Sequence, residues 1–203
     1  LTLMNENYQH PAMPEGDDVA EQIIKGIYKL ERVENDKSKL NVQLMGSGTI
    51  LNEVRKAAQI LCNDYNVSSD VYSVTSFNEL AREGQDVARW NMLNPEAEQK
   101  VPYIGQVITK DAGPAISATD YVKNYSDQVR AFIETEYRCL GTDGFGRSDS
   151  RENLRTHFEV NASYIVVASL YELAQRGDVE KKVVAEAIKR FEINAEKLNP
   201  LYA

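Results

Sequence analysis

Short apolar runs alternate with longer amphipathic segments along most of the chain. Between 50 and 65, apolar residues recur at three- and four-residue steps, which is the spacing of one face of a helix. The run 42–45 just before it is short and continuously apolar, as in a buried strand. A second strand is predicted at 71–75, followed by a helix around 77–90. This part of the chain therefore repeats the order strand, helix.

The segment before this central part has a different pattern. Pro11, Pro14 and Gly16 interrupt a stretch with few periodic apolar positions, which is typical of an irregular linker. A helix is predicted next, at 19–26, and then a strand at 27–33. The linker thus leads into the first predicted helix.

The alternation continues in the second half of the chain. Strands are predicted at 115–118 and 137–140. Between them, apolar residues at helical spacing predict an amphipathic helix over 121–133, with Thr119 or Asp120 placed to cap it.

The last fifty residues carry helical patterns and no further strand. Helices are predicted at 151–158, 162–175 and 179–191. Gly177 is placed to end the second of them, and Asp178 to cap the third.

Together these elements favour an α/β fold with a mostly parallel sheet and helices on both faces. The length of 203 residues suits one large domain with its own core. The chain starts at Leu1, and its first four residues look like a strand cut from something longer. We expect 1–18 to be the end of a preceding domain and its linker, and 19–203 to be the α/β domain.

Composition excludes several classes of function. The 23 Lys and Arg residues against 31 Asp and Glu residues give a formal net charge of −8, whereas a groove that binds nucleic acid needs a clustered cationic excess. No apolar run approaches the roughly 18 residues that span a bilayer. The start carries no secretory signal pattern. We expect a cytoplasmic protein with neither a nucleic-acid nor a membrane partner.

A glycine turn, Gly46 to Gly48, follows a predicted strand and opens a helix, as the phosphate-binding turn of a dinucleotide fold does. The third glycine of that motif is missing, because Leu51 occupies its position. The next strand also lacks an acid at its end to bind a ribose. We favour a tight turn with Thr49 as N-cap and keep nucleotide binding as the alternative.

A second glycine loop lies at 141–148, between a predicted strand and a helix. It is a near miss to a nucleotide phosphate loop, since Arg147 replaces the lysine and Asp143 adds a negative charge. Its backbone N–H groups and Arg147 could instead hold a carboxylate of a ligand or of a neighbouring domain. Plain turn and capping chemistry is the alternative, with Asp149 capping the helix and Glu152 three residues on. The candidate interface or anion-contact residues are Gly144, Phe145, Gly146, Arg147 and Ser148.

The residues that commonly carry catalysis form no recognisable site. His10 and His157 have no nucleophile motif around them, and with Cys62 and Cys139 they show none of the ligand spacings of a zinc site. Both cysteines fall in apolar patterns, so we expect buried thiols.

Several stretches of the sequence resemble one family over essentially the whole chain. The most specific is LGTDGFGRSDSRENLR at 140–155. The chain is similar to homodimeric bacterial pyruvate dehydrogenases, the decarboxylating first components of the pyruvate dehydrogenase complex, within the transketolase-like thiamine enzymes. The other stretches that carry the resemblance are 4–8, 11–16, 70–77, 89–93 and 156–159.

The resemblance implies the C-terminal domain of a longer enzyme. Its sheet would be mixed, with about five strands, helices on both faces and 27–33 as an antiparallel edge. The family uses thiamine diphosphate and magnesium, decarboxylates pyruvate, and passes the acetyl group to a lipoyl carrier on dihydrolipoamide acetyltransferase. The family's cofactor motif, Gly-Asp-Gly followed by Asn-Asn, is absent here. We therefore expect no catalytic, cofactor-binding or metal-binding residue in this chain, an inactive isolated domain, and a role in homodimer assembly and domain positioning.

Overall fold

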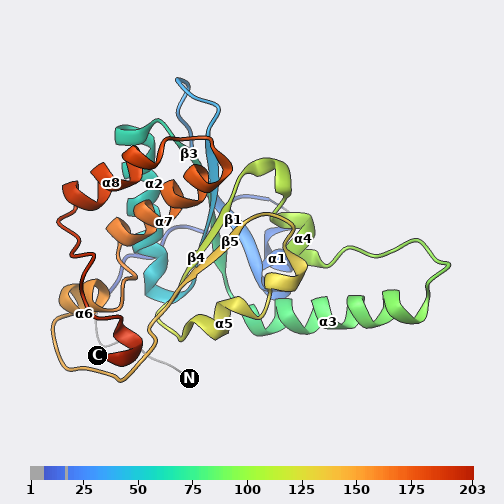
Figure 1. Cartoon of the computed structure of the whole chain (residues 1–203). Helices are drawn as coiled ribbons and strands as arrows, with labels where there is room; N and C mark the ends of the chain where they lie inside the picture. The colour runs from blue at the N-terminus through green and yellow to red at the C-terminus, as the bar shows by residue number, and fades with distance from the viewer. Residues whose placement is uncertain (1–6, 17) are drawn as a thin grey trace.

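The computed structural model describes residues 7–16 and 18–203. Its centre is a five-stranded sheet in the order β1-β3-β2-β4-β5. Strand β1 pairs antiparallel with β3, and all other neighbours are parallel (Figure 1). The mixed sheet with an antiparallel edge strand is thereby confirmed. The strands are β1 (Ile27–Val33), β2 (Asn41–Gly46), β3 (Ser68–Val74), β4 (Ala115–Ala118) and β5 (Tyr137–Leu140).

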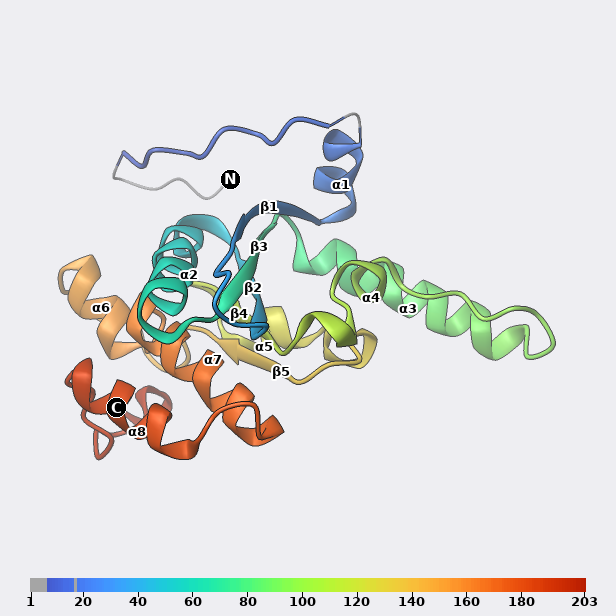
Figure 2. The same ribbon diagram turned by 90° about the horizontal axis from the view of Figure 1, so that it is seen from above.

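Helices cover both faces of this sheet, as the alternating pattern predicts (Figure 2). One face carries α2 (Leu51–Tyr65) and α7 (Ala162–Arg176), with α8 (Lys181–Arg190) packed on α7. The other carries α3 (Phe77–Leu93), α4 (Tyr103–Val107) and α5 (Lys123–Asp127). The remaining helices are α1 (Val19–Lys25), α6 (Arg151–His157) and the 3₁₀ turns η1 (Gly48–Ile50), η2 (Lys110–Ala112), η3 (Arg130–Phe132) and η4 (Pro200–Tyr202).

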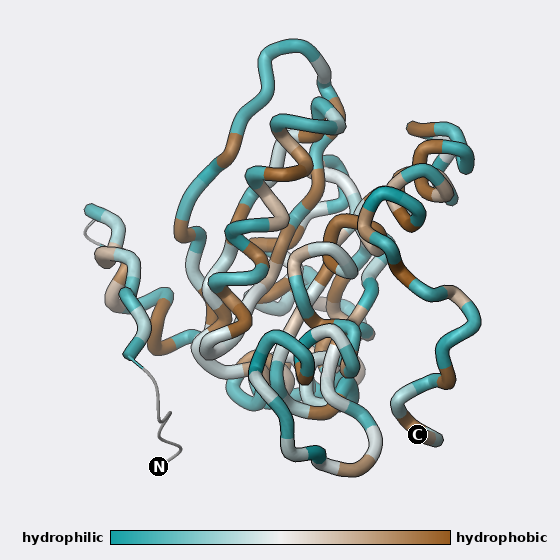
Figure 3. The backbone as a smooth tube through the Cα atoms, turned by 90° about the vertical axis from the view of Figure 1, so that its left-hand side faces the viewer, coloured by the Kyte–Doolittle hydropathy of each residue, from teal (hydrophilic) through white to brown (hydrophobic). Residues whose placement is uncertain are grey.

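Two hydrophobic clusters form the core, one on each face of the sheet. Successive strand residues point to opposite faces, so the buried Leu44 joins the cluster under α2 and α7, whereas the buried Met45 joins the cluster under α3. Val71 and Tyr72 divide in the same way on β3. Figure 3 shows the hydrophobic stretches concentrated in these central strands and in the helices that cover them.

Helix α3 extends well beyond the edge of the sheet, and the segment after it returns alongside (Figures 1 and 2). The amide of Asn91 holds the two together, since its Nδ2 donates to the carbonyl of Lys100 and its Oδ1 accepts from the Lys100 N–H, both at 2.9 Å. The Lys100 ammonium lies 3.9 Å from the centre of the Trp90 ring. The short helix α4, which the sequence pattern did not predict, follows this return segment.

The prediction of one amphipathic helix over 121–133 is wrong. The segment forms only the short helix α5 and the turn η3, and α5 begins after Val122 with no side-chain cap. Tyr121 and Val122 fit the helical spacing, but both side chains are about half-exposed. The hydroxyl of Thr119 instead accepts from the Tyr121 N–H at 3.2 Å, which fixes a turn rather than a helix.

Three further predicted caps are also wrong, each by one to two residues. Thr49 lies inside η1, whose N-cap residue is Ser47. The N-cap of α6 is Ser150 rather than Asp149, and that of α8 is Glu180 rather than Asp178. Of these three N-cap residues, only Ser150 caps its helix with its side chain, which accepts from the Asn153 N–H at 3.3 Å. Gly177 does end α7, in the left-handed conformation with φ 83°.

Cys62 and Cys139 are only half-buried, so the expectation of fully buried thiols is wrong. The Cys62 thiol donates to the carbonyl oxygen of Glu34 at 3.3 Å. Both side chains still pack against the hydrophobic clusters.

Candidate functional site

The neighbouring strands β2 and β4 are followed by connections that run to opposite sides of the sheet. From β2 the chain continues to β3 on one side, and from β4 it continues to β5 on the other. In open α/β sheets, ligands bind in the crevice outside such a switch point. The residues that follow the carboxyl ends of these two strands are therefore the first place to look for a site.

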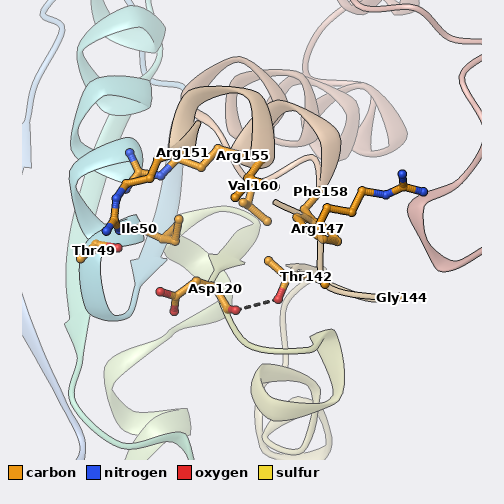
Figure 4. A pocket seen from close by; sticks show the side chains of 12 residues that line it. Thr49, Ile50, Asp120, Thr142, Gly144, Arg147, Arg151, Arg155, Phe158 and Val160 are labelled. Atoms are coloured by element: carbon orange, nitrogen blue, oxygen red, sulfur yellow. Dashed lines mark hydrogen bonds between the residues drawn. The ribbon is translucent and has the colours of Figure 1, made fainter. Parts of the chain in front are cut away.

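A pocket of about 280 Å³ lies at this edge of the sheet. Its walls come from the turns after β2, β4 and β5 and from helix α6 with the loop before it (Figure 4). The side chains that line the pocket are partly apolar and partly charged. The lining residues are Thr49, Ile50, Asp120, Thr142, Gly144, Gly146, Arg147, Arg151, Leu154, Arg155, Phe158 and Val160.

Asp120 supplies the negative charge of the pocket. Burial raises the pKa of its carboxyl group, although the nearby Arg155 and Arg151 oppose that shift. The Thr142 hydroxyl donates to the backbone carbonyl of Asp120 at 2.6 Å and joins the turns after β4 and β5. A Cβ on Gly48 would lie 3.6 Å from the Asp120 carboxylate. An acid so close to the glycine turn opposes a phosphate there, which supports the tight-turn interpretation of Gly46 to Gly48.

Two arginines of α6 supply positive charge, but at least one is already engaged. Arg155 pairs with Glu53 of α2 at 3.2 Å and donates to the Tyr8 hydroxyl at 3.4 Å. Glu53 is buried, and its second oxygen accepts from the Ala162 N–H at 3.1 Å. Arg151 lies over the Tyr8 ring at 5.7 Å. This network fixes α6 and α7 against α2 and holds the linker on α6.

The predicted contact loop lies partly in the pocket and partly outside it. Gly144, Gly146 and Arg147 line the pocket, whereas Phe145 is 82% exposed and Ser148 borders a neighbouring cavity of about 360 Å³. The Arg147 guanidinium points away from those of Arg151 and Arg155 (Figure 4). The loop therefore contributes backbone to the pocket but presents its two largest side chains outward.

Gly144 has φ 98°, and a Cβ there would lie 2.2 Å from the Pro200 carbonyl oxygen, so the loop is in close contact with the C-terminal turn. The Asp143 carboxylate accepts from the Lys123 N–H at 2.9 Å and pairs with the Lys123 ammonium at 3.7 Å. Asp143 is thus occupied within the fold. The loop does not fit a magnesium and diphosphate site.

The described parts of the chain, 7–16 and 18–203, contain no group of three or more His, Cys, Asp or Glu residues arranged to hold a metal ion. Over the same residues, no helix is long and apolar enough to cross a membrane. Of the two histidines, His157 ends α6 and borders the neighbouring cavity beside Ser148, and His10 lies in the linker.

Sequence reasoning missed most of the charged pocket residues. The sequence pattern indicates Asp120 only as a cap, and it indicates no role for Arg151, for Arg155 or for Glu53, the partner of Arg155. One signal was present, because Arg151 and Arg155 lie four residues apart, which places them on one side of the helix predicted at 151–158. Their partners on α2 and in the linker are more than a hundred residues away in sequence.

The strand order, the antiparallel edge and the helices on both faces define a three-layer α/β domain of the transketolase C-terminal type. A family model described as "Transketolase-like TK C-terminal domain" matches residues 26–161, and the chain belongs to this family. Solved transketolases show the same fold. Those from Leishmania mexicana and Campylobacter jejuni align with a TM-score of 0.50, at 18% and 17% identity, over 76% and 80% of this chain and 19% and 20% of theirs.

The similar curated proteins are more specific than the fold. The pyruvate dehydrogenase E1 component of Escherichia coli K12 is 62% identical over 100% of this chain, and that of Haemophilus influenzae is 57% identical over 100%. The Pseudomonas aeruginosa protein of the same name is 52% identical over 99%. The chain spans 22% to 23% of the length of these relatives. The resemblance stated from the sequence is therefore confirmed.

Proposed function

We propose that this chain is the C-terminal domain of a bacterial pyruvate dehydrogenase E1 component. The whole protein would be a cytoplasmic homodimer that decarboxylates pyruvate and reductively acetylates the lipoyl group of dihydrolipoamide acetyltransferase. Thiamine diphosphate and magnesium would supply the decarboxylation chemistry from a site outside this chain. The identity of 62% over the entire chain to the Escherichia coli protein is the observation that carries this proposal.

Within that enzyme, the domain would serve assembly and positioning. Two charged pairs at this edge hold the domain together: Arg155, which lines the pocket, pairs with Glu53, and Lys123 pairs with Asp143 in the loop beside the pocket. At the same time, large apolar side chains such as Phe145 are presented outward. Engaged charges and exposed apolar groups are typical of an interface rather than of a reaction centre.

The experiment compares two versions of the full-length protein that carries this chain. One is intact, and the other ends before residue 19. Pyruvate-dependent reduction of ferricyanide, with thiamine diphosphate and Mg²⁺ present, measures the activity, and light scattering measures the mass. We expect an active dimer for the intact protein and loss of both properties after truncation. An intact protein that does not consume pyruvate would contradict the assignment, and a truncated protein that stays dimeric and fully active would contradict the assembly role.

A second candidate is an anion- or nucleotide-binding site at Gly46 to Gly48 or at Gly141 to Ser148. The pocket at the switch point, with Arg147 in its wall, is the observation that favours it. Calorimetric titration of the full-length protein with ATP or NAD tests this candidate. Affinity that is lost in Gly48→Val or Arg147→Ala would support it, and unchanged affinity in both variants would contradict it.

A further inference from the structure

Exposed apolar side chains gather at the carboxyl edge of the sheet, around the pocket of Figure 4. Two of them follow β4, one follows β5, and two belong to the C-terminal turn η4. Their exposed fractions run from 47% to 82%. Single exposed apolar residues are common on protein surfaces, whereas a group of five from three segments marks a contact surface. We call this group the carboxyl-edge face; its residues are Tyr121, Val122, Phe145, Leu201 and Tyr202.

The three segments of this face are fixed to one another. The Thr142 N–H donates to the Tyr121 carbonyl at 2.8 Å, which joins the turns after β4 and β5. Gly144 packs so closely on Pro200 that a Cβ would clash with its carbonyl, which joins the loop to η4. The Asn199 side chain caps η4 by accepting from the Leu201 N–H at 2.9 Å. The face is therefore a built surface and not a frayed end.

The chain enters the domain at this same edge. Tyr8 of the linker contacts Arg155 and Arg151, and both arginines line the pocket that Gly144 and Arg147 also line. In Figure 4 the two arginines of α6 lie on one side of the pocket and Arg147 on the other. Any domain that precedes Tyr8 is thus tethered beside the edge that carries the exposed apolar group.

We propose that the carboxyl-edge face is covered by the preceding part of the same polypeptide. Phe145 would pack into apolar surface there, and Arg147 would pair with an acidic residue. Among the described residues, no acid pairs with Arg147. This inference rests on the proposed function, because it requires a longer protein that contains this chain. The curated relatives are more than four times as long as this chain.

Size and charge favour this occupant over a second copy of the domain. A stable interface between separate proteins buries about 800 Å² on each partner, more than five partly exposed side chains offer. A tethered neighbour needs less area, because the linker keeps its effective concentration high. Two copies of this chain would also each carry a formal charge of −8.

The first test places the photo-crosslinking residue p-benzoylphenylalanine at position 145 of the full-length protein. After irradiation, mass spectrometry identifies the crosslinked peptide, and a denaturing gel separates single from joined subunits. A crosslink within one subunit to residues that precede this chain supports the proposal. A crosslink to a second subunit, or no crosslink, overturns it.

The second test compares Phe145→Asp with Met92→Asp in the full-length protein. Met92 is 71% exposed on the projecting end of α3 and serves as a matched control outside the face. We expect the Phe145 variant to melt at least about 4 °C lower than wild type and the Met92 variant to melt within about 1 °C of it. Equal melting temperatures for the two variants would overturn the proposal. Pyruvate turnover by the wild-type protein is measured alongside, so that failure of the proposed function is recognised separately.

Discussion

Gly84 shows how a single missing side chain sets the position of α3. A Cβ built on Gly84 would lie 2.4 Å from Cδ2 of Phe132. In an isolated helix, Gly→Ala stabilises by about 1 kcal/mol, but overpacking a fitted contact costs about 1 to 3 kcal/mol. We expect Gly84→Ala to lower the free energy of unfolding by about 1 kcal/mol in urea denaturation.

The matched control for Gly84→Ala is Gly146→Ala, because no atom lies within 4 Å of a Cβ at Gly146. Its midpoint of denaturation should stay close to wild type. Phe132→Leu in the Gly84→Ala background should recover part of the loss. A more stable Gly84→Ala variant would show that the Phe132 ring moves aside freely.

Asp70 makes stability depend on acid pH. Burial would raise the pKa of this carboxyl group, but hydrogen bonds from Lys29, Asn41 and Arg32 outweigh it and lower the pKa. Lys29 Nζ lies 2.5 Å and Arg32 Nη1 3.0 Å from the carboxylate. A lowered folded-state pKa means that the unfolded chain binds the proton first as the pH falls. The stabilisation is thus present above about pH 4, the ordinary value, and is lost as the pH falls through the folded-state value.

We therefore expect Asp70→Asn to lower the free energy of unfolding by about 2 kcal/mol at pH 7, because two cations lose their anionic partner. The variant should also lose less stability than wild type between pH 5 and pH 3. Urea denaturation at pH 7, 5 and 3 measures both effects. Parallel pH profiles for the two proteins would show that Asp70 does not carry this dependence.

At the scale of elements, three helices, α3, α6 and α7, begin with a side-chain cap. Ser76 caps α3, since its hydroxyl accepts from the Glu79 N–H at 3.1 Å. Ser76→Ala should lower the free energy of unfolding by about 1 kcal/mol. Asp178 is the control, because it precedes α8 without capping it and its carboxylate pairs with Arg176 at 3.0 Å. Asp178→Ala should cost less than about 0.5 kcal/mol, and an equal loss in both variants would contradict the assignment of the caps.

The elements also show where sequence patterns are sufficient. The strands β4 and β5 begin and end at the predicted residues, 115–118 and 137–140, although Ser117 and Arg138 interrupt their apolar patterns. The pattern fails at 121–133, where the apolar side chains of Tyr121 and Val122 are exposed on the surface and do not pack in the core. Helical periodicity does not distinguish these two uses of an apolar residue. The strand at 27–33 is predicted from its pattern, but its antiparallel position at the edge of the sheet is predicted only from the family resemblance.

The candidate site was harder to predict than the fold, for a related reason. The glycine loop around Gly144 stands out in the sequence because its residues are contiguous. The pair of Glu53 with Arg155 does not, since the two residues are 102 positions apart and meet only when α2 and α6 pack at the same edge. Chemistry assembled by tertiary contacts leaves no local pattern. Only the four-residue spacing of the arginines could have indicated it.

For the whole molecule, the decisive question is whether cofactor chemistry resides in this chain. The domain has a core on each face of its sheet, so it has the means to fold without a ligand. Asp143, which comes closest to an echo of the cofactor motif, is held by Lys123. We expect calorimetric titration of the purified chain with thiamine diphosphate and Mg²⁺ to give no heat of specific binding.

A cooperative thermal transition must accompany that titration, because an unfolded chain would also fail to bind. Stoichiometric binding at micromolar concentration would place the cofactor in this domain and contradict the assembly role. Asp143→Asn would then be the first variant to examine, with Asp149→Asn as its control. Asp149 lies outside the glycine loop, and its carboxylate accepts from the Ser150 N–H and the Asn153 amide. Absence of binding in a folded chain would leave the carboxyl-edge face as the main functional surface of the domain. The domain would then support catalysis through its contact with the preceding domain.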